Sequence, residues 1–168
     1  MNQITNWQDA PLNDLVEHII EKHHGYLKSE LPYLGKLVKT IYRVHGENHP
    51  ELTQVYELFN NLKADLESHL SKEESLQYPA IKKYLETESE EDLKKAINII
   101  DELTKEHMDS VEILSELRKV TKNYVIPDDV CPTFELTYQK IQEVEADFFE
   151  HIQLENNILF PRLRELLK

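Results

Sequence analysis

The sequence contains few cysteine, glycine and tryptophan residues, and these shortages exclude some folds and functions. Its 168 residues include one cysteine (Cys131), three glycines and one tryptophan. A single cysteine excludes an intrachain disulfide and favours a reducing compartment, so we expect a cytoplasmic protein. The scarcity of glycine leaves few residues for the tight turns of β-hairpins.

Basic charge and long apolar runs are also scarce. The formal net charge is −13 at pH 7, and we expect no nucleic acid partner because affinity for phosphates depends on Lys and Arg. We expect no membrane span either, since no apolar run approaches the necessary ~20 residues. The first residues lack the basic and apolar regions of a signal peptide. The length suits one domain, so we expect residues 1–168 to form a single domain.

Apolar residues recur every three or four positions in four long segments, as in amphipathic helices. The first begins at Pro11 and ends near Gly46, and the second covers residues 52–81 and a little beyond. The third follows a capping-box pattern at Ser89, and the fourth begins at Pro132. No stretch alternates with period two. Because the connections are short, the sequence predicts an all-α, up-down-up-down four-helix bundle.

The second and fourth helical segments share an internal repeat. One copy starts at His69 and the other at His151, and both fit His-aliphatic-x-x-Glu-x-x-aliphatic-x-aromatic-Pro. The glutamates of the two copies are Glu73 and Glu155. A bare His-x-x-x-Glu pair arises readily by chance, but the shared aliphatic, aromatic and proline positions do not. The repeat is the strongest signal in the chain.

The residue types of the repeat are those of a metal site. Residues i and i+4 lie on one helix face, about 5–6 Å apart at Cβ, so the histidine and glutamate of each copy can approach the same metal. Imidazole suits iron and zinc, and a carboxylate can bridge two ions. On the first and third segments, His24 and His107 are the candidates for the remaining ligands.

A count of residues tests whether these candidates can meet. From His24 to His45, at the end of the first helix, is 21 residues. The return from Pro50 to His69 and Glu73 is 19 and 23 residues. At about 1.5 Å per residue, the chain comes back to nearly the same height. The residue count also places His107 of the third helix near this height, whereas the count for His151 of the fourth helix agrees less closely. The six candidate ligands at this level are His24, His69, Glu73, His107, His151 and Glu155.

Six such ligands suit two metal ions better than one. Four imidazoles make four bonds and two bridging carboxylates make four more, whereas two octahedral ions offer twelve positions. A shared oxo or hydroxo bridge takes two of the remaining four, leaving about one open position on each ion. A structural zinc site differs, because four protein ligands fill its coordination sphere and leave no open position. We therefore expect two octahedral metal ions, such as iron, each with an open position for a small diatomic molecule or water.

Together these features resemble the hemerythrin-like (HHE cation-binding) family of di-iron four-helix bundles. Within that family, the chain is similar to the iron–sulfur cluster repair di-iron proteins. The resemblance covers essentially the whole chain, and residues 151–161 are its most specific stretch. The residues that carry it are Glu21–His24 through Pro32, Arg43–His45, Ser68–Pro79, Glu106–His107, Cys131 and His151–Pro161.

The resemblance implies a di-iron centre held by the four candidate histidines and bridged by the two candidate glutamates. It also implies a role in repairing the iron–sulfur clusters of client proteins after nitrosative or oxidative damage, by iron donation or by NO and redox chemistry. An oxygen-binding protein or an oxygen or NO sensor is the alternative on this scaffold. Many members of the repair group carry an additional N-terminal domain with a cysteine pair. The 168 residues of this sequence contain neither that domain nor that pair. Steps that need those cysteines are therefore in doubt here.

The other histidines are expected outside the metal centre. His18, His23 and His49 are predicted to lie at the surface. His45 is left out of the ligand set because a continuous helix puts it about 30 Å from His24.

Three further carboxylates each have two interpretations, and the single cysteine has one. Glu106, beside His107, lines a channel to the metals or faces solvent. Asp65 and Asp147 orient the imidazoles one turn later, or are ordinary helix-face carboxylates. Cys131 is expected to be a buried thiol. The oligomeric state stays open.

Overall fold

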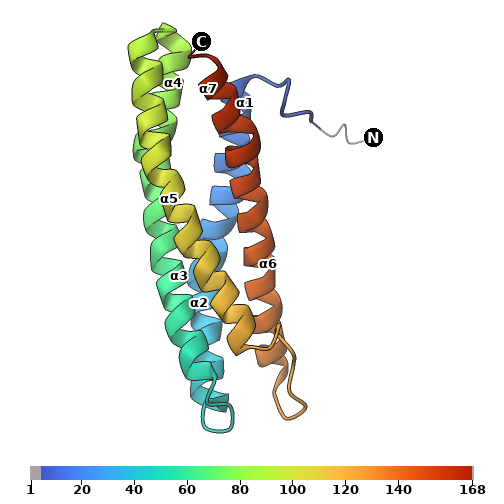
Figure 1. Ribbon diagram of the computed structural model, residues 1–168. Helices are drawn as coiled ribbons and strands as arrows, with labels where there is room; N and C mark the ends of the chain where they lie inside the picture. The colour runs from blue at the N-terminus through green and yellow to red at the C-terminus, as the bar shows by residue number, and fades with distance from the viewer. Residues whose placement is uncertain (1–4, 168) are drawn as a thin grey trace.

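The computed structural model describes residues 5–167, and within that range the chain forms helices and no strands. Figure 1 shows the helices arranged as long rods that lie side by side. The first rod is α1 (Leu12–His18), η1 (Ile19–His24) and α2 (Gly25–His45), and the second is α3 (Leu52–Lys72), η2 (Glu73–Gln77) and α4 (Tyr78–Thr87). The third is α5 (Glu90–Val120), and the fourth is α6 (Pro132–Leu154), η3 (Glu155–Leu159) and α7 (Phe160–Glu165). The predicted all-α four-helix bundle is confirmed.

Helix ends follow the predicted local signals. The side chain of Ser89 accepts a hydrogen bond from the backbone N–H of Asp92 and so caps α5, which the capping-box pattern required. Pro132 is the first residue of α6, a position where the missing N–H of proline costs little. Pro32 lies inside α2, and the helix continues through it.

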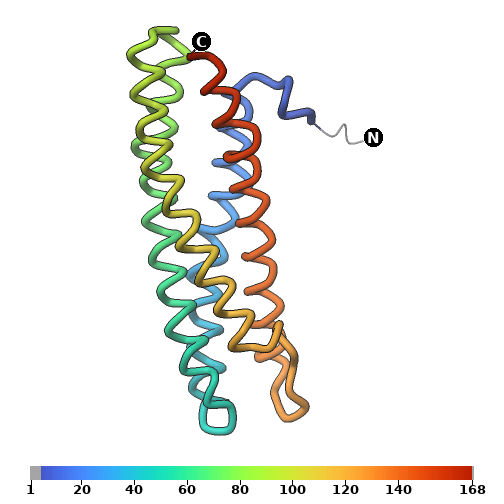
Figure 2. Tube along the Cα trace, in the orientation of Figure 1, coloured from blue at the N-terminus to red at the C-terminus, as the bar shows by residue number. Residues whose placement is uncertain are grey.

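The rods are arranged so that α3 packs against α2 and α5, while α6 packs against α2. Figure 2 shows that the connections 46–51 and 121–131 lie at one end of the bundle, and that α1 and α7 lie together at the other. None of the helices in residues 5–167 is long and apolar enough to cross a membrane.

Two clusters of buried apolar side chains fill the interior, with a buried polar layer between them. In the fourth rod, Phe148 belongs to one cluster and Leu159 to the other, and His151 and Glu155 fall between them in the chain. The same order holds in the first rod, where His24 separates the two clusters. The polar layer is therefore closed above and below by apolar packing.

Three rods contain a π-helical turn at this polar layer: η1 ends at His24, η2 begins at Glu73 and η3 begins at Glu155. The N–H of Tyr78 bonds to the carbonyl of Glu73, and that of Phe160 to the carbonyl of Glu155, each five residues back. A proline follows each of these two donors. The sequence repeat therefore corresponds to the same wide turn in both copies. Such turns are rare and frequent at functional sites.

Candidate metal centre

The structure brings the six candidate ligands together in the polar layer, and all six are buried. They come from all four rods. Five of the six contribute donor atoms to two trios, each with its atoms within 4.8 Å of one another, and Glu155 lies beside both trios. The first trio is His24, Glu73 and His151, and the second is His69, Glu73 and His107. Glu73 belongs to both trios.

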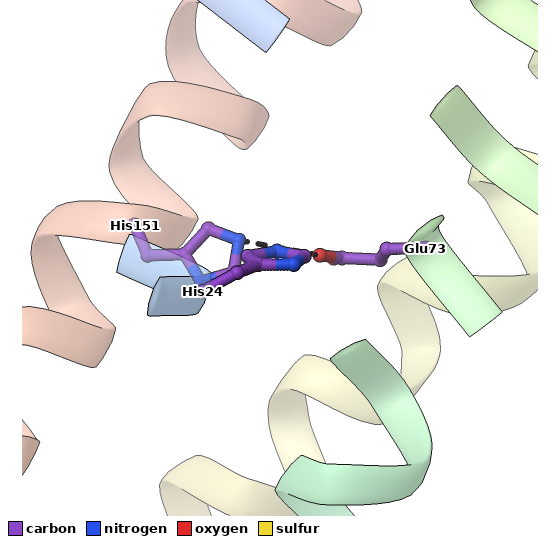
Figure 3. A group of neighbouring side chains, drawn as sticks. All are labelled: His24, Glu73 and His151. Atoms are coloured by element: carbon purple, nitrogen blue, oxygen red, sulfur yellow. Dashed lines mark hydrogen bonds and ion pairs between the residues drawn. The ribbon is translucent and has the colours of Figure 1, made fainter. Parts of the chain in front are cut away.

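Each carboxylate oxygen of Glu73 faces one trio. Its Oε2 lies 2.8 Å from Nε2 of His24 and 3.3 Å from Nε2 of His151, and Figure 3 shows these three side chains pointing toward one another. Its Oε1 lies 2.7 Å from Nε2 of His69 and 3.6 Å from Nε2 of His107. The carboxylate therefore spans the two trios.

Glu155 uses its two oxygens differently. Its Oε1 lies 2.6 Å from Nε2 of His151 and 3.9 Å from Nε2 of His107, so it faces one imidazole of each trio. Its Oε2 accepts a hydrogen bond of 2.8 Å from Nε2 of Gln77. Only one oxygen of Glu155 is therefore free to face the imidazoles.

Several donor atoms in this layer approach one another without forming hydrogen bonds. Within the part of the chain that the structure describes, Nε2 of His69 and Oε1 of Glu73 have no hydrogen-bond partner, and the same holds for Nε2 of His151 and Oε1 of Glu155. Buried polar atoms without partners cost free energy. Imidazole and carboxylate lone pairs that converge in this way are what a cation satisfies, so the residues fit a bound metal.

Two carboxylates buried side by side need positive charge nearby. Burial alone would raise the pKa of Glu73, but the charge of His151 and the hydrogen bond with His24 hold it well below its usual range. Burial and the charge of Glu73 raise the pKa of Glu155. Burial opposes protonation of His151, but the two carboxylates outweigh it and raise the pKa of His151 to about 10. A metal cation provides the same compensation.

The outward-facing nitrogen of His69 is held by Glu106. Oε2 of Glu106 lies 2.7 Å from Nδ1 of His69, and its Oε1 accepts a hydrogen bond of 2.5 Å from Nζ of Lys72. Glu106 is therefore a partner of the site, and part of its side chain, which is 32% exposed, faces solvent. Because Glu106 takes up Nδ1, Asp65 does not orient this imidazole.

His23 corrects another expectation, because its side chain is completely buried and not at the surface. Its Nδ1 lies 2.9 Å from Oδ1 of Asp147, and its ring stacks on His151 at 5.7 Å between centroids. Asp147 therefore pairs with His23 and not with His151. The wide η1 turn reduces the rotation between successive residues, so two consecutive histidines face inward. His18 and His49 are partly buried.

His45 and Cys131 form a pair outside the two trios. Nε2 of His45, the last residue of α2, lies 3.1 Å from Sγ of Cys131. Hydrogen bonds from His45 and from the backbone N–H of Phe134 lower the pKa of Cys131 to about 7. Cys131 is partly exposed, so the expectation of a buried thiol is wrong.

Gln77 and Tyr78 were not among the candidate site residues predicted from the sequence. Both side chains are buried at the site, and the hydroxyl of Tyr78 donates a hydrogen bond of 3.1 Å to Oε2 of Glu73. The repeat contained a signal that could have identified them. Gln77 and Tyr78 carry polar groups at positions where the second copy has the apolar residues Leu159 and Phe160.

Comparison with known proteins agrees with this geometry. Residues 15–163 match the family model described as the hemerythrin HHE cation binding domain. The chain belongs to this family. The predicted resemblance to hemerythrin-like proteins is therefore confirmed.

Two relatives of the chain carry the same functional name. The iron-sulfur cluster repair protein YtfE of Citrobacter koseri is 32% identical over 157 residues, which cover 94% of this chain and 68% of that protein. The iron-sulfur cluster repair protein ScdA of Staphylococcus epidermidis is 28% identical over 166 residues, which cover 96% of this chain and 71% of that protein.

Proposed function

We propose that this protein is a non-haem di-iron protein that takes part in the repair of iron–sulfur clusters damaged by nitrosative or oxidative stress. The observation that carries the proposal is the position of Glu73, whose two oxygens each face a separate trio of buried donor atoms. The two relatives are named for cluster repair. Those names favour repair over reversible oxygen binding.

In this proposal, four imidazoles and two carboxylates hold two iron ions, one at each trio. The two oxygens of Glu73 face different trios and would hold one ion each, and Oε1 of Glu155 faces an imidazole of each trio. Imidazole and carboxylate donors suit iron. When bound, the iron pair supplies redox chemistry and open positions for a small diatomic molecule, NO or O2. The apolar clusters on either side of the polar layer limit access of bulk water to these residues.

The proposed partners are client proteins that contain iron–sulfur clusters, and the proposed routes are iron donation or reaction with NO. Residues 1–168 would act as a single domain in either route. We place this activity in the cytoplasm, where cysteine thiolates that ligate such clusters stay reduced.

The first test is the iron content of protein purified from cells grown without added iron. We expect about two irons per chain, as coordination by six protein ligands allows, and an absorption spectrum that changes on reduction with dithionite. His69→Ala and His151→Ala each remove one ligand and should lower the bound iron sharply. His49→Ala is the matched control, because His49 pairs with Asp129 outside the trios.

Unchanged iron content in both ligand variants would rule out the assignment. A second assay asks whether the iron-loaded protein restores the activity of an enzyme whose iron–sulfur cluster NO has damaged. We expect restoration by the wild-type protein and by His49→Ala, and little by His151→Ala. A stable, reversible oxygen adduct without restoration would instead favour the oxygen-binding alternative.

A further inference from the structure

Beside the first trio, one buried imidazole has a nitrogen atom without a hydrogen bond. His23 is completely buried, and its Nε2 has no hydrogen-bond partner among residues 5–167. This nitrogen lies 4.0 Å from Oε1 of Glu150, whose side chain is 53% exposed. That separation is too long for a hydrogen bond. A cation between the two atoms can bond to both of them at the usual distance of about 2.0–2.2 Å.

The other nitrogen of His23 is held in the way that a metal ligand requires. Nδ1 lies 2.9 Å from Oδ1 of Asp147. Because an ionised carboxylate only accepts, the proton lies on Nδ1, and the neutral imidazole keeps a lone pair on Nε2, the nitrogen toward Glu150. Metal-binding histidines usually have such a carboxylate behind them. Asp147 also has a second oxygen, Oδ2, without a partner in the described part of the chain.

His23 lies between an exposed carboxylate and the first trio. Its ring stacks on that of His151, with 5.7 Å between centroids, and it directly precedes His24 in the chain. Both of these neighbours belong to the first trio. Side-chain exposure falls from 53% at Glu150 to 14% at Asp147 and 0% at His23. Carboxylates and an imidazole therefore lead from the surface inward to one trio.

A structural role explains these groups less well. Lys22 lies 3.1 Å from Oε1 of Glu150, but both side chains are more than half exposed, so their ion pair contributes little stability and does not block a cation. The unpaired Nε2 of His23 costs free energy, which an apolar ring in its place would avoid. The position therefore carries a donor atom that packing does not require.

We propose that His23 and Glu150, with Asp147 behind His23, form an outer site where a divalent cation binds on its way into or out of the first trio. The inference rests on the proposed function, because the cargo is then ferrous iron, which imidazole and carboxylate ligands suit. The ion keeps its charge and only exchanges ligands. On entry it gives up water for His23 and Glu150, and then passes to the donor atoms of the trio. Two protein ligands make a weak site, as transfer requires.

The first test counts metals on the iron-loaded protein after dialysis against Zn²⁺, which accepts the same ligand types. Iron and zinc are measured together, so exchange of one for the other leaves their sum unchanged. Glu150→Gln removes the exposed ligand, and His23→Phe keeps a buried ring but removes both nitrogens. Glu143→Gln is the matched control, because Glu143 is an exposed carboxylate on the same helix that pairs with Lys140.

We expect the sum of iron and zinc to be about three per chain in the wild-type protein and in Glu143→Gln, and about two in Glu150→Gln and His23→Phe. Asp147→Asn keeps both ligands and should weaken binding of the third metal about 10–100-fold. The same sum in all of these proteins would overturn the inference, as would a wild-type protein that holds two irons and no third metal. A wild-type protein that binds fewer than two irons would instead overturn the proposed function itself.

The second test measures how fast iron leaves the protein for a ferrous chelator. Because passage through the outer site scales with its occupancy, we expect one of the two irons to leave at least about tenfold more slowly from Glu150→Gln and His23→Phe than from Glu143→Gln. The starting iron content should be the same in all three variants. Equal release rates would overturn the role of the outer site in iron transfer.

Discussion

Nδ1 of His69 lies 2.7 Å from Oε2 of Glu106, and this carboxylate is also bonded to Lys72. The contact fixes the proton of the imidazole on Nδ1, which directs the lone pair of Nε2 toward Glu73. Residues of this kind, which hold a ligand without touching the metal, support affinity by orienting the ligand and increasing its basicity.

Glu106→Gln should therefore weaken iron binding without removing a ligand. The amide keeps the shape of the side chain but loses the charge that polarises His69, and we expect iron affinity to fall about 10–100-fold. Competition with a ferrous chelator measures the change. Glu112→Gln, an exposed carboxylate on the same helix, is the control. Equal affinities for the two variants would contradict the role of Glu106.

Cys131 should react with alkylating agents in a pH range set by His45. The thiolate is the reactive form, and since the pKa of Cys131 is lowered to about 7, the rate should reach half of its maximum near that pH and fall below it. His45→Phe removes the main cause of the shift and should move the midpoint toward the ordinary value of about 8.5.

Labelling with iodoacetamide followed by mass spectrometry measures this rate at the only cysteine of the sequence. The same pH profile in the wild-type protein and in His45→Phe would show that His45 does not lower the pKa of Cys131.

The ion pair between Arg118 and Glu145 should contribute to stability more than the exposed pairs. Nε of Arg118 lies 2.7 and 3.0 Å from the two oxygens of Glu145, which is 6% exposed. Arg118→Ala leaves that carboxylate buried with no cation, and because water reaches one side of Arg118, we expect a loss of about 1–3 kcal/mol.

Unfolding by urea measures this loss. Lys95→Ala, which breaks an exposed ion pair with Glu91, should change stability little by comparison. A larger effect for Lys95→Ala than for Arg118→Ala would contradict the prediction.

Tyr78 should contribute to stability mainly by packing. Tyr78→Phe removes one hydrogen bond to Glu73 and should lower the stability of the iron-free protein by about 1 kcal/mol. Tyr78→Ala also removes a buried ring and should cost about 3–5 kcal/mol. Urea unfolding of both variants separates the two contributions, and equal losses would mean that the ring contributes little.

The sequence predicted the helices well, and it predicted that the six candidate ligands lie close together, because both depend on local spacing. A helix places residues four apart on one face, so the repeats at His69 and His151 could be recognised without a structure. Counting residues at a fixed rise per residue was sufficient to expect His24 and His107 near the same level. The separation of His45 from the site followed from the same count.

The partners of these residues could not be predicted in this way. The sequence offered Asp65 as a possible partner of His69, but Glu106 of α5 is its partner in the structure, because the choice depends on how α3 and α5 are rotated about their axes. The direction of His23 depends on the η1 turn, for which the sequence interpretation had no rule. Gln77 contacts a residue on another rod, so this contact is invisible in either helix alone.

By itself, the sequence determined the four amphipathic helices, the internal repeat and six candidate metal ligands, because periodicity and spacing along one helix fix these features. Only the tertiary structure decided that Glu73 faces both trios and that Gln77 donates a hydrogen bond to Glu155. The reason is physical: contacts between helices depend on rotation and on local widening of the backbone. These properties come from packing the whole bundle and not from any single segment.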